Sequence, residues 1–496
     1  MNIYRNYYKK IHQNLATNKT FYINGNKKIN YTKALNFAKK ILFYLRNHKK
    51  KLNVYTYSNK SFEMYASIFP ILISGCKWIP LSLSNPTNRI KDIINLIKPD
   101  ILFYDHDNSD VKNLFLKNKA IVIPFKKINA ININKTYDIN IAEYINKINY
   151  NSDAFYYLTS GSTGTPKAIK IAHKNIISDT YNQINHLYGK DKHNLIFGDY
   201  YDTAFSIFFD IYFPAIFLGS AISPSITKND AYLIYQHVKK NKINVLVCVP
   251  STIQRLKIFS GNKKFNHIFK IMILTGEPFY LDLMKYIFKN FKFQKLFNCY
   301  GGTEMSNWIT YHRCKKTDLN NFSKLNLVPI GKNFKDAKIH IKNGELIVTG
   351  PMVSKGYMDT KQNIGKFKFG VNFNTFFTGD SVFKKNGVFI CKGRKDNMIK
   401  KHGYRIELSE IEAILRKIKF VNQGIVFENK NKNYNNYITA VISLRMKTKE
   451  ENLRNEFLKL LPQYMIPKKI IIIKSLPINS NGKIDRKRII DIYSEK

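Results

Sequence analysis

The chain has 496 residues, of which 44% are hydrophobic and 14% aromatic, and its formal net charge is +47. The length exceeds that of one typical core, so at least two domains are expected, and the apolar content excludes global disorder. The lysines are spread along the whole chain without a basic tail or a nucleic-acid-binding module, which favours a codon-bias origin of the charge. A basic nucleic-acid-binding protein without catalysis stays as a remote alternative.

The first 150 residues alternate helical and strand patterns. Residues 33–47 carry apolar side chains at helical spacing, and residues 53–58 predict a strand that leads into a helix over residues 62–74. Short apolar runs at 101–105 and 120–125 predict buried strands. This alternation is typical of an α/β architecture.

One apolar stretch, residues 205–222, is nearly long enough to span a bilayer. It contains Asp210 and Pro214, and an intramembrane carboxylate is costly. We therefore expect a buried helix packed on a sheet and no membrane span.

Strands are predicted at residues 244–250 and 270–276, and from residue 331 onward short strands and turns indicate a β-rich subdomain. After about residue 396 the pattern returns to alternating helix and strand, with a helix expected over 407–418. The prediction is a large α/β N-terminal domain with layered parallel sheets, residues 1–395, and a small mobile α+β C-terminal domain, residues 396–496.

The five cysteines are widely spaced and form no CxxC pair, which disfavours a disulfide framework or a zinc site. The N-terminus lacks the apolar core of a signal peptide. Both observations fit a cytoplasmic protein.

The strongest local signal is the loop inside YYLTSGSTGTPKAIKIAH, residues 156–173. Glycines permit close backbone approach, and successive N–H groups and hydroxyls can surround phosphate oxygens. The order Thr165-Pro166-Lys167 differs from a Walker loop, which needs Gly-Lys-Ser/Thr. The predicted phosphate-binding residues are Thr159, Ser160, Gly161, Ser162, Thr163, Gly164, Thr165 and Lys167.

Together with other segments, this loop resembles the adenylate-forming (AMP-binding) superfamily, which includes acyl-CoA synthetases, luciferases and amino-acid adenylation enzymes. The resemblance runs in order through INYTKAL at 29–35, the 76–90 segment, NCYGGTE at 298–304, VPIGK at 328–332, the 344–359 segment, TGD at 378–380, the 393–412 segment, LPQYMIP at 461–467 and NGKIDR at 481–486. It is similar in length and ending to stand-alone adenylation enzymes and D-alanine–carrier protein ligases.

The NCYGGTE segment has a physical interpretation beside the resemblance. Tyr300 can stack on a purine, Asn298 offers an amide to the base edge, and a carboxylate such as Glu304 suits magnesium. Gly301 and Gly302 allow the backbone to approach a nucleotide. The resemblance adds Thr303 as an α-phosphate contact.

The resemblance implies further roles. Asp380 takes the ribose hydroxyls, Arg394 contacts ribose and phosphate, and Arg405 completes the nucleotide-binding set. Asp396 is the hinge about which the C-terminal domain swings, and Gly403 borders the channel for the thiol. Lys483 bridges the carboxylate and the α-phosphate, because a cation there lowers repulsion and stabilises the transition state.

The nature of the acid stays open at this stage. Amino-acid-activating members place an Asp as partner of the substrate ammonium; an ungapped alignment on Asp210 puts Phe205 there, whereas a shifted one puts Asp202 there. By resemblance Cys299, Asn307 and Trp308 line the acyl pocket, and Trp308 suggests a small or flat substrate.

The implied reaction uses ATP and magnesium to form an acyl-adenylate with release of pyrophosphate. The expected acceptor is the phosphopantetheine thiol of an acyl or peptidyl carrier protein, because such proteins are usually acidic and this chain is basic. Coenzyme A, and therefore an acyl-CoA synthetase, is the alternative.

Overall fold

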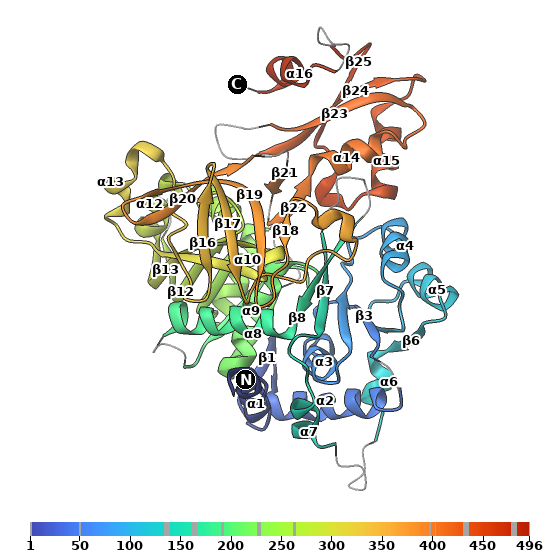
Figure 1. Ribbon diagram of the computed structural model, residues 1–496, viewed down its shortest axis with the longest axis vertical. Helices are drawn as coiled ribbons and strands as arrows, with labels where there is room; N and C mark the ends of the chain where they lie inside the picture. Colours follow the sequence, from blue (N-terminus) through green and yellow to red (C-terminus); the bar gives the residue numbers. More distant parts are fainter. Residues whose placement is uncertain are drawn as a thin grey trace. The chain divides into compact units, whose positions relative to one another are not determined.

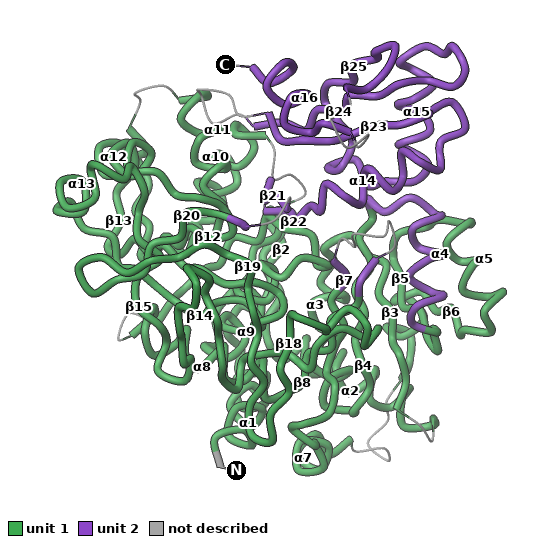
Figure 2. The backbone as a smooth tube through the Cα atoms, turned by 45° about the horizontal axis from the view of Figure 1, so that its top comes forward, with its two compact units in different colours: residues 1–83, 98–157, 168–393 green, residues 84–97, 158–167, 394–496 purple. Residues whose placement is uncertain are grey.

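The computed structural model describes residues 2–48, 51–132, 139–159, 166–189, 193–225, 230–260, 264–395, 398–401, 403–429, 436–477 and 484–495. Two compact units are present (Figure 2). The first comprises residues 1–83, 98–157 and 168–393, and the second comprises residues 84–97, 158–167 and 394–496. The mixed α/β class with parallel sheets in the large part and antiparallel pairs in the C-terminal part is confirmed (Figure 1).

A six-stranded sheet with the order β6-β5-β3-β4-β7-β8 occupies the N-terminal part, and its β6, β5, β3, β4 and β7 pair in parallel. Its strands are β3 (Asn53–Tyr57), β4 (Lys77–Pro80), β5 (Ile101–Tyr104), β6 (Ile121–Pro124), β7 (Asp153–Thr159) and β8 (Lys167–Ala172). The accompanying helices are α1 (Asn2–Leu15), α2 (Tyr31–Leu45), α3 (Phe62–Ile73), α5 (Ser109–Lys117), α6 (Phe125–Asn129) and α7 (Ile141–Asn146). Side-chain caps define where two of these helices begin. Asn30 accepts a hydrogen bond from the Lys33 N–H at the N-terminus of α2, and Ser61 accepts one from the Met64 N–H at the N-terminus of α3.

A nine-stranded mixed sheet follows, with the order β15-β14-β13-β12-β11-β9-β10-β1-β2. Its strands are β1 (Thr20–Asn24), β2 (Lys27–Asn30), β9 (Ile196–Asp199), β10 (Ala221–Pro224), β11 (Val245–Cys248), β12 (Phe265–Thr275), β13 (Phe291–Gly302), β14 (Asn307–Arg313) and β15 (Lys332–Asn333). The helical segments around it are α8 (His173–Gln183), the π-helical η1 (Ile184–Tyr188), α9 (Ser206–Leu218), α10 (Ala231–Lys240), α11 (Pro250–Ser260), α12 (Leu281–Asn290) and α13 (Asp318–Asn321). Short 3₁₀ turns are η2 (Thr303–Met305), η3 (Ser323–Leu325) and η4 (Thr360–Asn363).

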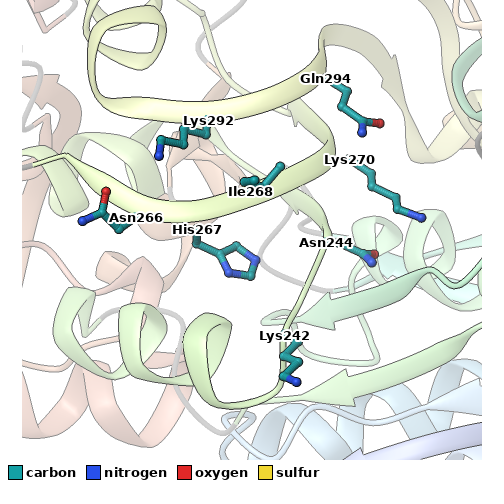
Figure 3. A pocket seen from close by; sticks show the side chains of 8 residues that line it. All are labelled: Lys242, Asn244, Asn266, His267, Ile268, Lys270, Lys292 and Gln294. Carbon is teal, nitrogen blue, oxygen red and sulfur yellow. The ribbon is translucent and has the colours of Figure 1, made fainter.

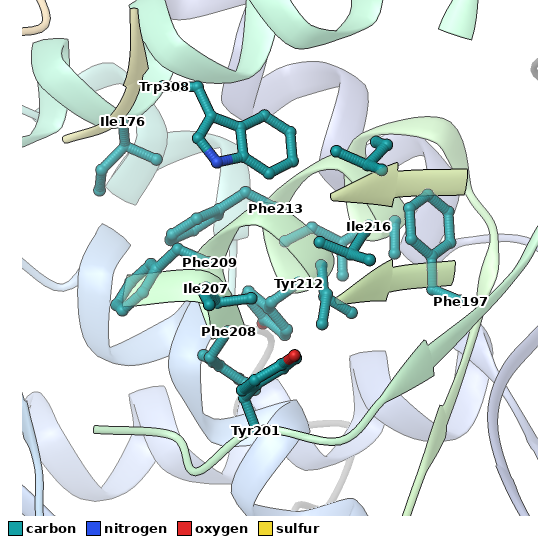
Figure 4. Packing of buried hydrophobic residues seen from close by; sticks show 14 of the residues in the cluster. Ile176, Phe197, Tyr201, Ile207, Phe208, Phe209, Tyr212, Phe213, Ile216 and Trp308 are labelled. Atoms are coloured by element: carbon teal, nitrogen blue, oxygen red, sulfur yellow. The ribbon is translucent and has the colours of Figure 1, made fainter. Parts of the chain in front are cut away.

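Helix α9 is the apolar stretch that raised the membrane question. It is buried over most of its length, and Figure 4 shows its Phe208, Phe209, Tyr212 and Phe213 among the buried side chains. The Phe209 ring stacks on that of Phe155, with ring centroids 4.2 Å apart. It ends at Gly219, which adopts the left-handed conformation with φ of 64°. Among the described helices, none combines the length and apolar character that crossing a membrane requires.

The expected β-rich subdomain is an antiparallel sheet of β16 (Lys338–Lys342), β17 (Glu345–Gly350), β18 (Phe367–Lys368), β19 (Asn374–Lys385) and β20 (Val388–Arg394). Strand β19 carries Asp380, the predicted ribose contact.

The second unit contains α4 (Thr87–Leu96) beside C-terminal elements. These are β21 (Met398–Lys401), β22 (Tyr404–Glu407), α14 (Leu408–Leu415), β23 (Val421–Asn429), β24 (Tyr437–Leu444), α15 (Glu450–Leu460), the 3₁₀ turn η5 (Gln463–Met465), β25 (Lys469–Ile473) and α16 (Arg486–Tyr493). A buried ion pair joins α4 to α14, with Arg89 Nη1 2.6 Å from Glu410 Oε1. Segment 84–97 therefore packs with residues far along the chain.

Candidate active site

The β13–β14 hairpin gathers most of the predicted residues of the first unit. Its register pairs Gly302 with Asn307, Gly301 with Trp308 and Cys299 with Tyr311. The predicted nucleotide residues at the end of β13 therefore lie directly opposite predicted acyl-pocket residues on β14.

The two glycines at the end of β13 have different surroundings, and only one of them is required by packing. A Cβ at Gly301 would lie 1.5 Å from the backbone oxygen of Asn307, so the close approach of β14 requires glycine there. A Cβ at Gly302 would meet Met305 Cε at 3.3 Å and Glu304 Oε2 at 3.6 Å. Packing thus explains Gly301 without a nucleotide, whereas Gly302 lies beside the Glu304 carboxylate.

Glu304 follows in the η2 turn and is 1% exposed. Its Oε1 accepts a hydrogen bond of 2.6 Å from the Tyr357 hydroxyl. Tyr357 was not singled out from the sequence, although it lies in the 344–359 segment that carries part of the resemblance. A charge-assisted bond of this kind fixes the direction of the carboxylate.

The residues around Glu304 fit a magnesium ion that arrives with a nucleotide. Within the described ranges, no three His, Cys, Asp or Glu side chains are grouped to hold a metal. Magnesium is commonly held by one or two carboxylates plus phosphate oxygens and water. Glu304 would supply one such oxygen ligand, and Thr303, which precedes it, is 8% exposed.

Tyr300 and Asp380 are brought together from β13 and β19. The Tyr300 hydroxyl donates a hydrogen bond to Asp380 Oδ2, and both side chains are buried. Burial, followed by the Asp380 charge, raises the pKa of Tyr300 well above its usual value. The pair joins the predicted adenine and ribose contacts, and the phenol orients the carboxylate.

Asn298 lies two residues before Tyr300 on β13. Its Nδ2 donates to the backbone oxygens of Val328 at 3.3 Å and Pro329 at 2.9 Å. The VPIGK segment therefore holds the Asn298 amide in place.

The predicted acyl-pocket residues are largely buried. Cys299 and Trp308 are each 2% exposed and Asn307 is 5% exposed, while Asp202 and Phe205 are half-buried. Burial raises the pKa of the Cys299 thiol well above its usual value, so the thiol of this cysteine is neutral.

Asp202 caps the turn that precedes α9. Its Oδ1 accepts from the Ala204 N–H at 2.9 Å, and its Oδ2 accepts from the Ser82 hydroxyl at 2.6 Å. Phe205 is the N-cap position of α9, and its N–H donates to the Asp202 backbone oxygen at 2.9 Å. The two candidates for the ammonium partner are thus neighbours in one turn.

The remaining described site residues belong to the second unit. Lys167 is 5% exposed and its Nζ donates to Glu407 Oε1 at 2.9 Å. Arg405 directs its Nε at Met398 Sδ, and Gly403 has a φ of 80°. Thr159 and Arg394 end β7 and β20, respectively. The predicted residues Ser160, Gly161, Ser162, Thr163, Gly164, Thr165, Asp396 and Lys483 lie outside the described residues.

A surface groove of about 530 Å³ lies elsewhere in the first unit (Figure 3). Its lining includes Lys242, which precedes β11, Lys270 in the middle of β12 and Lys292 near the beginning of β13. Lys292 precedes Tyr300 by eight residues of one strand, which corresponds to roughly 26 Å. The groove is therefore separate from the hairpin site.

Comparison with known proteins places the chain in a class. Residues 11–358 match the AMP-binding enzyme family, and residues 410–483 match the AMP-binding enzyme C-terminal domain. The chain belongs to the AMP-binding enzyme family and is an ATP-using, AMP-forming ligase.

Individual proteins and solved structures are also similar to this chain. The chain is 27% identical over 477 residues to the D-alanine–D-alanyl carrier protein ligase of Staphylococcus aureus (strain JH9), covering 94% of each protein. A double mutant of o-succinylbenzoate CoA synthetase from Bacillus subtilis has a TM-score of 0.82 at 18% identity, with 97% of this chain and 98% of that chain covered. An adenylation domain from Vibrio cholerae in complex with glycyl-adenosine-5'-phosphate has a TM-score of 0.80 at 19% identity, with 97% of each chain covered. These two structures share the fold.

Proposed function

We propose that the protein activates a small amino acid as its acyl-adenylate and passes the acyl group to the phosphopantetheine thiol of a carrier protein. The supporting observation is the β13–β14 hairpin, on which Gly301 and Gly302 pair with Trp308 and Asn307, while Tyr300 precedes the two glycines on β13 and Glu304 follows them in the η2 turn. A nucleotide site and an acid site on one hairpin suit a reaction that joins the two ligands. The carrier-ligase relative matches over nearly its whole length, which supports the carrier as acceptor.

In the first half-reaction a carboxylate oxygen of the acid attacks the α-phosphorus of ATP, and pyrophosphate leaves. Tyr300 stacks on the adenine, Asp380 and Arg394 hold the ribose, and Thr303 contacts the α-phosphate. Residues 160–165 and Lys167 surround the phosphates. A magnesium ion held by Glu304 would neutralise phosphate charge.

Lys483 supplies the cation between the acid carboxylate and the α-phosphate, where the two anions otherwise repel. Residues 396–496 act as a small domain that turns about Asp396 and carries Lys483 away after adenylation. The carrier thiol then enters past Gly403, attacks the acyl carbonyl and releases AMP. Arg405 completes the nucleotide contacts, and the compartment is the cytoplasm.

A pyrophosphate-exchange screen over amino acids, hydroxy acids, aryl acids and short fatty acids tests the first half-reaction. We expect exchange with a small amino acid in the wild type, its loss in Lys483→Ala, and wild-type exchange in Lys487→Ala, which removes a neighbouring exposed lysine. No exchange with any acid would overturn the proposal.

Acceptor choice is tested by thioester formation with an acidic phosphopantetheinylated carrier protein and with coenzyme A. Because a basic surface attracts an acidic partner, carrier loading should weaken as the salt concentration rises. Faster transfer to coenzyme A than to every carrier would favour the alternative, an acyl-CoA synthetase.

A further inference from the structure

The hairpin of β18 and β19 in the first unit carries exposed apolar side chains (Figure 1). The two strands pair antiparallel, so residues 369–373 form the connection between them. Phe369 is 54% exposed and Phe373 is 43% exposed, and Val371 between them is fully exposed. These three residues are called the apolar tip. Ile364, which precedes β18, adds a further apolar side chain that is 81% exposed.

The stability of the hairpin does not explain the apolar tip. The hairpin is anchored by Phe367 and Phe376, which are buried and have ring centroids 4.8 Å apart. Connections between strands are ordinarily built from Gly, Asn, Asp, Ser and Pro. A single exposed apolar residue is normal, but a group of them marks a contact surface. The tip is therefore a candidate surface for binding a partner.

The charge around the tip indicates the chemistry of this partner. Residues 360–379 include Lys361, Lys366 and Lys368 but no Asp or Glu, and the exposed Lys368 directly precedes the tip. Peripheral proteins bind anionic bilayers by placing apolar side chains in the head-group region and basic ones at the lipid phosphates. Protein–protein interfaces, in contrast, are depleted in lysine. The combination therefore favours an anionic lipid surface over a protein.

The tip is separate from the predicted nucleotide site. Asp380, the predicted ribose contact, follows Phe373 by seven residues along β19. Seven residues of an extended strand correspond to roughly 23 Å. A bilayer that contacts the tip is therefore bound away from the ribose contact.

We propose that the apolar tip inserts into the head-group region of an anionic lipid bilayer, with Lys368 at the level of the lipid phosphates. The contact is peripheral and reversible, because even a single myristoyl chain gives only marginal binding to a membrane. The inference goes beyond the proposed function and does not depend on the reaction that the protein catalyses.

The test measures co-sedimentation of the full-length protein with vesicles. One set contains equal parts of phosphatidylcholine and phosphatidylglycerol, and the other contains phosphatidylcholine alone. The wild type should bind the anionic vesicles, and binding should weaken as the salt concentration rises. Val371→Asp and Lys368→Glu should each weaken this binding by about 10-fold or more, since the first replaces an inserted apolar group by a carboxylate and the second reverses a charge near the lipid phosphates.

Each variant has a matched control elsewhere in the first unit. Leu116→Asp changes a residue of α5 that is 56% exposed, and Lys28→Glu reverses the charge of an exposed lysine on β2. Both controls should bind within about 2-fold of the wild type, because they change the net charge as the tip variants do but leave the tip intact. Substitutions at such exposed positions usually alter stability little, and equal thermal unfolding of all variants checks this.

A tryptophan at the tip gives a second readout. The chain has two tryptophans, Trp78 and Trp308, and both are buried. In Val371→Trp the new indole should shift its emission to shorter wavelength on anionic vesicles, and brominated lipids should quench it. Leu116→Trp should show neither change.

Four results would overturn the inference. The first is a wild type that binds neither kind of vesicle. The second is equal binding by the wild type and Val371→Asp, which would assign the binding to the positive charge of the whole chain. The third is a wild-type dimer that Val371→Asp converts to a monomer, which would make the tip a contact between two copies. The fourth is slower loading of a carrier protein by Val371→Asp without vesicles, which would make it a protein-docking surface.

Discussion

The hydrogen bond from Tyr357 to Glu304 gives a direct test of the metal role. Tyr357→Phe removes the hydroxyl that donates to Glu304 Oε1 at 2.6 Å and leaves the ring in place. A hydrogen bond to a charged group contributes about 1.5–3 kcal/mol, and losing a partner of a metal ligand typically costs about 10–100-fold in affinity or activity. We expect the magnesium concentration for half-maximal pyrophosphate exchange to rise by about 10-fold or more.

The assay measures initial exchange rates at saturating ATP and acid over a magnesium titration. Tyr31→Phe is the matched control, because the Tyr31 hydroxyl donates to the Ser220 backbone oxygen at 2.7 Å, also in the first unit. The control should keep the wild-type magnesium dependence. If Tyr357→Phe shows the wild-type magnesium dependence and the wild-type maximal rate, Glu304 does not depend on this bond and the reasoning is wrong.

Three further predictions concern stability and nucleotide binding. Burial lowers the pKa of His173 to about 3, whereas its pKa in the unfolded chain is about 6.5. The stabilisation by the neutral ring is therefore complete above pH 6.5, and the fold loses roughly 3 kcal/mol of it by pH 4. His173→Gln should flatten this fall in urea denaturation between pH 6.5 and 4, and an unchanged slope would contradict the reasoning. Glu410→Ala leaves Arg89 buried without its partner and should cost about 3–5 kcal/mol in thermal unfolding, whereas wild-type stability would show that the pair contributes nothing. Asp380→Asn should raise the KM for ATP by about 10-fold and leave that for the acid unchanged; equal changes in both would argue against a ribose contact.

Local patterns predicted the elements well where burial is uniform. The strand predicted at residues 53–58 corresponds to β3, and the helix predicted in the apolar run at 205–222 corresponds to α9. Continuous apolar stretches leave few alternatives to a buried strand or helix. Strand β12 begins at Phe265, earlier than the predicted residue 270. Its first residues include the polar Asn266 and His267, which are not buried and made this part of the strand resemble a loop.

Motifs predicted the chemical groups but not their partners. Glu304 was found from its neighbours Gly302 and Thr303, since a short segment carries that signal. Its bond to Tyr357 depends on tertiary packing between residues 53 positions apart, and no local pattern encodes it. The same holds for the Tyr300–Asp380 bond, although each residue had been singled out by its own motif.

The buried aspartates Asp179 and Asp210 were not predicted as a pair by any motif. Asp179 lies outside every motif used, and Asp210 was noted as a charge that argues against a membrane span and as the anchor of an alignment, but not as a residue with a role of its own. Their shared contact with Gln183 arises where α8 and α9 pack together. A carboxylate within an apolar helix was a signal that a polar partner had to exist, but the sequence did not identify it.

The central claim is that the acid becomes an acyl-adenylate, and oxygen transfer tests it most directly. The substrate acid, labelled with ¹⁸O in its carboxylate, is incubated with the protein, ATP, magnesium and the thiol acceptor, and the AMP is analysed by mass spectrometry. The carboxylate oxygen that attacks the α-phosphorus stays on AMP when the thiol takes the acyl group. The account predicts one ¹⁸O in AMP and none in pyrophosphate. Formation of ADP with label in inorganic phosphate, or AMP without label, would contradict it.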